Sequence, residues 1–158
     1  MTYTFKSEQF LNTSLDTAWE FFSSARNLAQ ITPPEMAFEI HTDLENVEVY
    51  EGMIIDYTVR PLFGIPLKWK TEICRVNKPH FFSDKQLKGP YSLWEHTHSF
   101  IEKDNGVLMQ DEVKYKLPLG FIGALAHTFI VKKKIRDIFK FREETLNRLF
   151  IKSVNESV

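Results

Sequence analysis

The feature that most constrains the fold is a run of short alternating segments followed by one long helical stretch. Phe121–Phe150 has apolar residues at helical spacing, with one face formed by Val131, Ile135, Ile138, Leu146 and Leu149. Before it, alternating apolar and polar residues predict seven β-strands, at Tyr3–Leu11, Phe38–Thr42, Met53–Arg60, Leu67–Val76, Phe81–Lys88, Tyr91–Ile101 and Val107–Leu117. Short connections between strands predict an antiparallel sheet, and one long helix is available to cover its concave side.

Two short helices are predicted between the first and second strands. Ser14 suits the N-cap of the first, because the residues after it are apolar at helical spacing. The second covers Asn27–Ile31 and is ended by a Pro-Pro pair. The predicted fold is therefore α+β: a curved antiparallel sheet of about seven strands around a long C-terminal helix, with two short helices after strand 1.

The composition is that of one globular domain with many aromatic rings. The chain has 158 residues, of which 43% are hydrophobic and 26% charged, ordinary values for a single domain. Its 14 phenylalanines predict either a bulky core or a pocket lined by rings. We expect one ligand-binding domain over residues 1–152 and a flexible C-terminal tail over residues 153–158.

Charge and cysteine content limit the partners and the compartment. A net charge of −1 favours neither nucleic acid nor an anionic membrane as partner, and the basic run Lys132–Lys134 fits a solvated helix face. The lone Cys74 excludes an internal disulfide and fits a reducing compartment. The first residues lack the pattern of a signal peptide, and no segment has the length of a membrane span. These features predict a cytoplasmic protein without stable membrane insertion.

The last two strands are predicted to form a hairpin around Asp104-Asn105-Gly106. Their more apolar faces, which should point inward, carry Trp94, His96, His98 and Phe100 on one strand and Met109, Asp111, Val113, Tyr115 and Leu117 on the other. A four-residue loop would place His98 opposite Asp111 and Trp94 opposite Tyr115, whereas a two-residue loop would place His98 opposite Val113. In both registers His96, His98 and Asp111 enter one inward-facing patch.

Polar residues on an inward face are costly unless they are paired or hydrated. His96 and His98 therefore have three interpretations. They contact a polar group of a ligand, they form a structural pair that fixes the sheet register, or they act as acid and base with Asp111 as partner. The candidate catalytic residues are accordingly His96, His98 and Asp111.

Several segments together resemble the START-like, or SRPBCC, superfamily and within it a bacterial subgroup described as cyclase/dehydrase. The segments that carry the resemblance are Leu15–Phe22, Phe82–Gln86, Gly89–Tyr91, Trp94–Phe100, Asp111–Tyr115 and Leu117–Gly120. The resemblance covers nearly the whole chain and implies a helix-grip fold with an internal cavity. It does not imply one activity, because the superfamily includes carriers, sensors, cyclases and hydrolytic activators.

The predicted ligand-binding residues combine the inward faces of the sheet with the junction before the last helix. They are Trp69, Trp94, His96, His98, Phe100, Met109, Asp111, Tyr115, Phe121, Leu125 and Phe129. The last three belong to a glycine-containing apolar stretch that is either the mouth of the pocket or a strand-to-helix junction packed on the sheet. Two histidines and an aspartate on one face have the composition of a facial metal site, but no second group of ligands supports one, so no metal or cofactor is predicted.

Three functions from different classes fit these observations. The first is a module that binds a hydrophobic small molecule, such as a lipid, quinone, isoprenoid or aromatic polyketide, as carrier or sensor. The second is an enzyme of the cyclase or dehydratase type that uses the cavity histidines to move protons. The third is a protein-interaction domain without a ligand.

Overall fold

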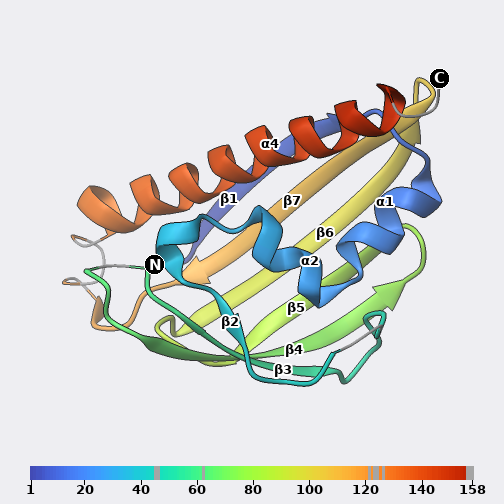
Figure 1. The fold of residues 1–158 in the computed structure, drawn as a ribbon. Helices are drawn as coiled ribbons and strands as arrows, with labels where there is room; N and C mark the ends of the chain where they lie inside the picture. Colours follow the sequence, from blue (N-terminus) through green and yellow to red (C-terminus); the bar gives the residue numbers. More distant parts are fainter. Residues whose placement is uncertain (45–46, 62, 121, 123–124, 126, 156–158) are drawn as a thin grey trace.

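The computed structural model describes residues 1–44, 47–61, 63–120, 122, 125 and 127–155, with only the backbone described at 127 and 151–155. Seven antiparallel strands form one curved sheet in the order β1-β7-β6-β5-β4-β3-β2 (Figure 1). Their bounds are β1 (Tyr3–Leu11), β2 (Glu39–Ile40), β3 (Ile54–Val59), β4 (Leu67–Asn77), β5 (Phe81–Lys88), β6 (Leu93–Lys103) and β7 (Gly106–Lys116). The predicted seven-stranded antiparallel sheet is confirmed.

The helices lie on the concave side of this sheet (Figure 1). They are α1 (Leu15–Phe22), α2 (Ala25–Leu28), the 3-10 turns η1 (Ala29–Ile31) and η2 (Pro34–Met36), the π-helical turn η3 (His127–Val131), and α4 (Lys132–Asn155). α4 runs along the β1 and β7 side, with α1 and α2 beside it. No helix in the described ranges is long and apolar enough to cross a membrane.

Local sequence explains where the first helices begin and end. The Ser14 hydroxyl accepts a hydrogen bond from the Thr17 backbone N–H at 3.1 Å, as predicted for an N-cap. The second helix was predicted at Asn27–Ile31; it begins two residues earlier, at Ala25, and its last turn narrows to 3-10 geometry. Pro34 then occupies the first position of η2, where a missing N–H costs nothing.

The C-terminal helix differs from its prediction at both ends. Its predicted start, Phe121, lies outside the described residues, and the chain passes through η3 before α4 begins at Lys132. At the other end, α4 continues to Asn155, into the segment predicted as a flexible tail. Residues 156–158 of that tail lie outside the described residues, and its flexibility stays a prediction.

The β6–β7 hairpin closes with a tight turn. Lys103 pairs with Gly106, so the loop consists of Asp104 and Asn105, which have positive φ angles of 52° and 60°. Two such residues are typical of the type I′ turn, whose twist matches that of the strands. A Cβ atom on Gly106 would lie 2.6 Å from the Leu11 carbonyl oxygen, so glycine permits the close approach of β1 to this turn.

This turn sets the register on which the site depends. His98 lies opposite Asp111 and Trp94 lies opposite Tyr115, which confirms the register predicted with a four-residue loop over Lys103–Gly106. The predicted loop length is wrong, because Lys103 and Gly106 pair with each other and only Asp104 and Asn105 remain in the loop. The alternative register, with His98 opposite Val113, is wrong, because the Lys103–Gly106 pair extends the same ladder to the turn.

The core is unevenly distributed along the concave face. One end is filled by side chains that are almost fully buried, among them Leu11, Trp19, Phe100, Met109 and Leu146. Towards the other end, rings from four strands and from the β5–β6 connection contact one another with centroids 4.7–6.1 Å apart: Tyr57, Trp69, Tyr91, Trp94 and Tyr115. The first group forms a closely packed core, and part of the second group surrounds a cavity.

Candidate functional site

A cavity of about 220 Å³ lies between the sheet and the helices. Its walls come from α1, α2, β3, β4, β5, β6 and α4, and most of the side chains that line it are apolar. The aromatic members are Phe21, Phe22, Phe38, Tyr57, Trp69, Phe82, Tyr91, Trp94 and Phe139. A cavity with such walls favours a ligand that is largely apolar and contains flat rings.

One wall of the cavity is polar, and the sheet register explains why. Asp84 on β5 lies opposite His96 on β6, and His98, two residues further along β6, lies opposite Asp111 on β7. Side chains two residues apart share a face of a strand, so all four point to the concave side. Arg142 on α4 reaches the same group from the helix. We call these five residues the polar cluster.

Asp111 is the centre of the polar cluster. Its Oδ1 atom lies 2.8 Å from Nε2 of His96, in a hydrogen bond, and 3.1 Å from Nδ1 of His98. The same oxygen is 3.5 Å from Nη2 of Arg142. The carboxylate, both imidazoles and the guanidinium are all buried. A buried carboxylate needs such partners, because in an apolar surrounding its charge would otherwise be strongly destabilising.

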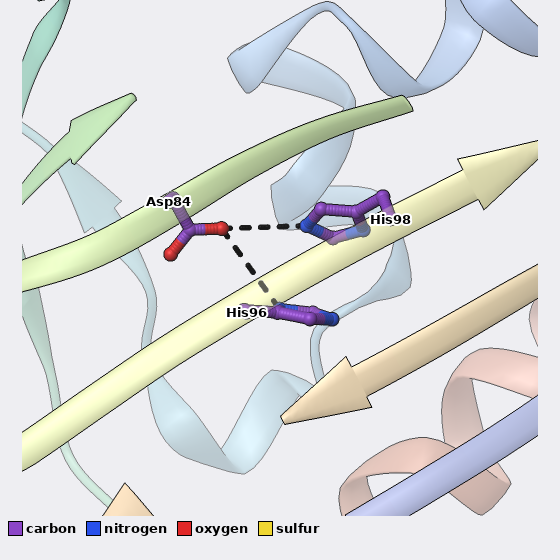
Figure 2. Close-up of side chains that lie close together, drawn as sticks. All are labelled: Asp84, His96 and His98. Atoms are coloured by element: carbon purple, nitrogen blue, oxygen red, sulfur yellow. Dashed lines mark ion pairs between the residues drawn. The ribbon is translucent and has the colours of Figure 1, made fainter. Parts of the chain in front are cut away.

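Asp84 contacts the two histidines from the opposite side (Figure 2). Its Oδ2 atom lies 3.4 Å from Nε2 of His98 and 4.0 Å from Nδ1 of His96. The two imidazole rings lean together, with centroids 3.8 Å apart. Each histidine therefore lies between two carboxylates and presents a different ring nitrogen to each of them.

Burial and neighbouring charges shift the titration of the polar cluster in different directions. Burial favours the neutral form of His96 and, together with the adjacent His98, lowers its pKa below the usual value. Burial acts on His98 in the same direction, but the carboxylates of Asp111 and Asp84 outweigh it and raise its pKa. Burial alone would raise the pKa of Asp111, yet Arg142 and the two histidines hold it well below its usual range.

Two N–H groups in the cavity wall have no hydrogen-bond partner in the described part of the chain. They are Nε1 of Trp69 and Nε of Arg142. Both side chains are more than nine-tenths buried, and both residues line the cavity. A buried donor without an acceptor costs about 1–3 kcal/mol. Unsatisfied donors are rare in folded proteins and call for a partner, such as a ligand or water.

The predicted ligand-binding residues divide into those that line the cavity and those that do not. Trp69, Trp94, His96 and His98 line it. Four others are buried but are not among its lining residues: Phe100, Met109, Asp111 and Tyr115. Phe100 and Met109 pack in the core with Trp19, because the inward face of the hairpin extends beyond the cavity.

Two described residues of the predicted mouth, Leu125 and Phe129, are not among the residues that line the cavity. Leu125 and Phe129 are exposed, with 47% and 73% of their surface accessible, and neither lines the cavity. Phe121 lies outside the described residues. A role for this segment in ligand entry stays a prediction.

Two members of the polar cluster were missed by the sequence-based prediction. Asp84 follows Phe82 on the inward face of its strand, so strand alternation combined with the register of β5 would have placed it beside His96. Arg142 interrupts an otherwise apolar helical series that includes Ile135, Phe139 and Leu146. A charged residue at such a position is the available signal, because it requires a buried partner.

Comparison with known proteins gives the fold. No protein-family profile and no curated protein matches the chain. Among solved structures, a START superfamily protein from Mycobacterium smegmatis has a TM-score of 0.68 at 13% identity, covering 92% of this chain and 98% of that one. Norcoclaurine synthase from Thalictrum flavum has a TM-score of 0.66 at 17% identity, covering 94% and 93%. The major latex-like protein 151 of Panax ginseng has a TM-score of 0.64 at 11% identity, covering 94% and 97%.

At these identities the similarity shows the architecture and nothing finer. The chain has a START-like helix-grip fold, as the resemblance of its segments implied.

The central position of Asp111 can be tested by its stability contribution. We expect Asp111→Asn to lower the free energy of unfolding by about 3 kcal/mol, because it leaves Arg142 buried without its carboxylate. The matched control is Glu112→Gln on the opposite face of the same strand, whose partners are the surface lysines Lys6 and Lys114. Urea unfolding should show a change of less than about 0.5 kcal/mol for this control. Equal losses of stability in the two variants would contradict the central position of Asp111 in the polar cluster.

Proposed function

We propose that this protein binds a hydrophobic or aromatic small molecule in its internal cavity, as a carrier or sensor. The observation that carries the proposal is the cavity, with its apolar and aromatic lining and one polar wall. Well-packed cores seldom contain voids much larger than a water molecule, so a space of 220 Å³ needs an explanation in function. Lipids, quinones, isoprenoids and polyketide-like compounds have the required apolar surface.

The cavity volume limits the size of the ligand. A cavity of about 150 Å³ in a protein core is large enough for benzene. The larger cavity here, of about 220 Å³, suits a compound of about two fused rings or a chain of similar volume. Larger ligands would require the helices to move away from the sheet.

The walls also favour a ligand with hydrogen-bond acceptors. Trp69 and Arg142 each contribute an N–H without a partner among the described residues, and both residues line the cavity. A carbonyl, hydroxyl or carboxylate oxygen on the ligand would satisfy them. Apolar burial would provide most of the affinity, and these donors would orient the polar end.

Filling the cavity should abolish binding without unfolding the protein. Ala25 is buried on α2 and lines the cavity, so Ala25→Leu would extend its side chain into the space. We expect this variant to bind a two-ring probe, 2-naphthol, at least tenfold more weakly than wild type in calorimetric titration.

The matched control is Ala29→Leu, one turn further along the chain. Ala29 is exposed and does not line the cavity, so this substitution adds the same atoms without filling the space. Circular dichroism and thermal unfolding of both variants would verify that they fold. Unchanged naphthol binding by a folded Ala25→Leu protein would exclude the cavity as the binding site.

A second candidate function is acid–base catalysis on a ligand in the cavity. The observation in its favour is the placement of His96, which lines the cavity and hydrogen-bonds to Asp111 through Nε2. This bond holds the proton on Nε2 and leaves the Nδ1 lone pair available as a base. A fixed base in a largely apolar site suits the removal of a proton next to a carbonyl group.

Proton abstraction can be measured without knowledge of the natural substrate. 2-Tetralone is a two-ring ketone whose C1 hydrogens exchange with deuterated solvent when a base removes them. If His96 acts as a base, the wild-type protein should accelerate this exchange about 100-fold, measured by NMR. The His96→Gln variant should show no acceleration. The control is His41→Gln, at an exposed histidine outside the cavity. If wild-type protein does not raise the exchange rate above that in buffer, the catalytic function is contradicted and only the binding function remains.

A further inference from the structure

We propose that Asp84, His96 and His98 form a binding site for a divalent transition-metal ion, such as Zn²⁺ or Fe²⁺, in the wall of the cavity. One ligand atom from each residue lies within 4.8 Å of the other two. Two imidazoles and one carboxylate form the donor set that binds such ions at one face and leaves positions open for other ligands. This site goes beyond the binding of an apolar molecule and does not depend on it.

The first supporting observation is which ring nitrogen each histidine presents to Asp84. Asp111 contacts Nε2 of His96 but Nδ1 of His98. The remaining nitrogens, Nδ1 of His96 and Nε2 of His98, both face the same oxygen of Asp84 (Figure 2). These two nitrogens and the Asp84 oxygen therefore lie close together between β5 and β6.

The second observation is that Asp111 occupies the place of an outer carboxylate. Histidines that bind metals almost always donate their other ring N–H to a carboxylate, carbonyl or water, which fixes the ring and raises its basicity. Here Asp111 hydrogen-bonds to Nε2 of His96 and lies 3.1 Å from Nδ1 of His98, and Nη2 of Arg142 lies 3.4 Å from the same His98 nitrogen. From the sequence, Asp111 was the aspartate considered for such a set, and no metal was predicted. In the structure, Asp111 contacts the rings from β7 and Asp84 contacts them from β5.

The third observation is the balance of charge. The polar cluster contains two carboxylates and one guanidinium, and Arg142 lies beside Asp111 rather than Asp84. In the described part of the chain, the ion pairs of Asp84 are with His96 and His98, and not with a lysine or arginine. A carboxylate that is only 15% exposed and lacks a permanent cation is a favourable position for a metal ion.

The distances require a small adjustment. Two ligands on a tetrahedral zinc ion lie about 3.3 Å apart, given metal–ligand bonds of about 2.0–2.2 Å. The Asp84–His98 separation of 3.4 Å already fits, and the Asp84–His96 separation of 4.0 Å needs less than about 1 Å of movement. The two histidine nitrogens lie within 4.8 Å of each other, so this pair needs up to about 1.5 Å. All three ligand residues line the cavity, so the open positions of the ion would be accessible to a bound molecule. A metal at Nδ1 of His96 would exclude the acid–base role, so the two are alternatives.

The site can be tested with the metal alone. Protein stripped with a chelator should bind one Zn²⁺ per chain in calorimetric titration, and Co²⁺ should produce visible absorption bands of a low-symmetry site. Asp84→Asn should weaken Zn²⁺ binding at least about 100-fold, and Asp111→Asn about 10–100-fold. The control is Asp56→Asn, an exposed carboxylate on β3 paired with Lys70, which should bind as wild type does.

A second readout needs only the wild-type protein and covers the case in which a variant fails to fold. In NMR spectra of the imidazole rings, Zn²⁺ should shift the signals of His96 and His98 and leave those of the exposed His41 and His80 in place. Absence of stoichiometric binding, or equal binding by folded Asp84→Asn protein, would overturn the proposal. Because no organic ligand is present, this failure would leave the proposed apolar binding untouched.

Discussion

The buried carboxylate of Asp111 is the interaction on which the cavity wall depends. It joins two strands through His96 and His98 and joins the sheet to α4 through Arg142. The guanidinium is further held between the rings of Phe22 and Phe139, each with its centroid 5.5 Å away. Strand register, histidine orientation and helix position are therefore coupled at one point. Removing the charge would leave Arg142 buried without its carboxylate.

The polar cluster lies between two regions with different packing. On one side, α1 and the last turns of α4 bring large side chains against the sheet, and Trp19, Phe100 and Leu146 leave almost no exposed surface. On the other side, Trp69 of β4 contacts Trp94 of β6 edge to face and Tyr91 at a tilt, and all three rings line the cavity. The many aromatic side chains therefore form both a bulky core and part of a pocket wall, the two alternatives that the composition predicted. The polar wall separates the two and gives the cavity a defined polar end.

The sequence predicted the parts of this structure that depend on local pattern. Strand alternation, the hairpin turn and the helical period after Phe121 were sufficient for the sheet and the long helix, because one buried face imposes each pattern. The inward placement of His96, His98 and Asp111 followed from the same alternation. The loop length was left open, because Asp104 and Asn105 both adopt positive φ angles, which non-glycine residues seldom do.

Asp84 and Arg142 could be assigned to the polar cluster only from the three-dimensional structure. Asp84 reaches the histidines only through the β5–β6 pairing, and Arg142 only through the rotation of α4 against the sheet. The boundary of the cavity also depends on packing: the inward residues Phe100 and Met109 continue the pattern of His96 and His98 but meet α1 instead of open space. Alternation shows which side of a sheet a residue faces, and packing of the helices decides whether that side is filled.

Native mass spectrometry of freshly purified protein would show whether the cavity holds a small apolar molecule. We expect a mass above that of the denatured chain, with a single added compound that is released on denaturation. That compound should carry an oxygen acceptor on an apolar ring or chain system of about two rings. Protein that shows only the bare chain mass, as purified and after incubation with quinones, isoprenoids and fused-ring aromatics, would contradict the account.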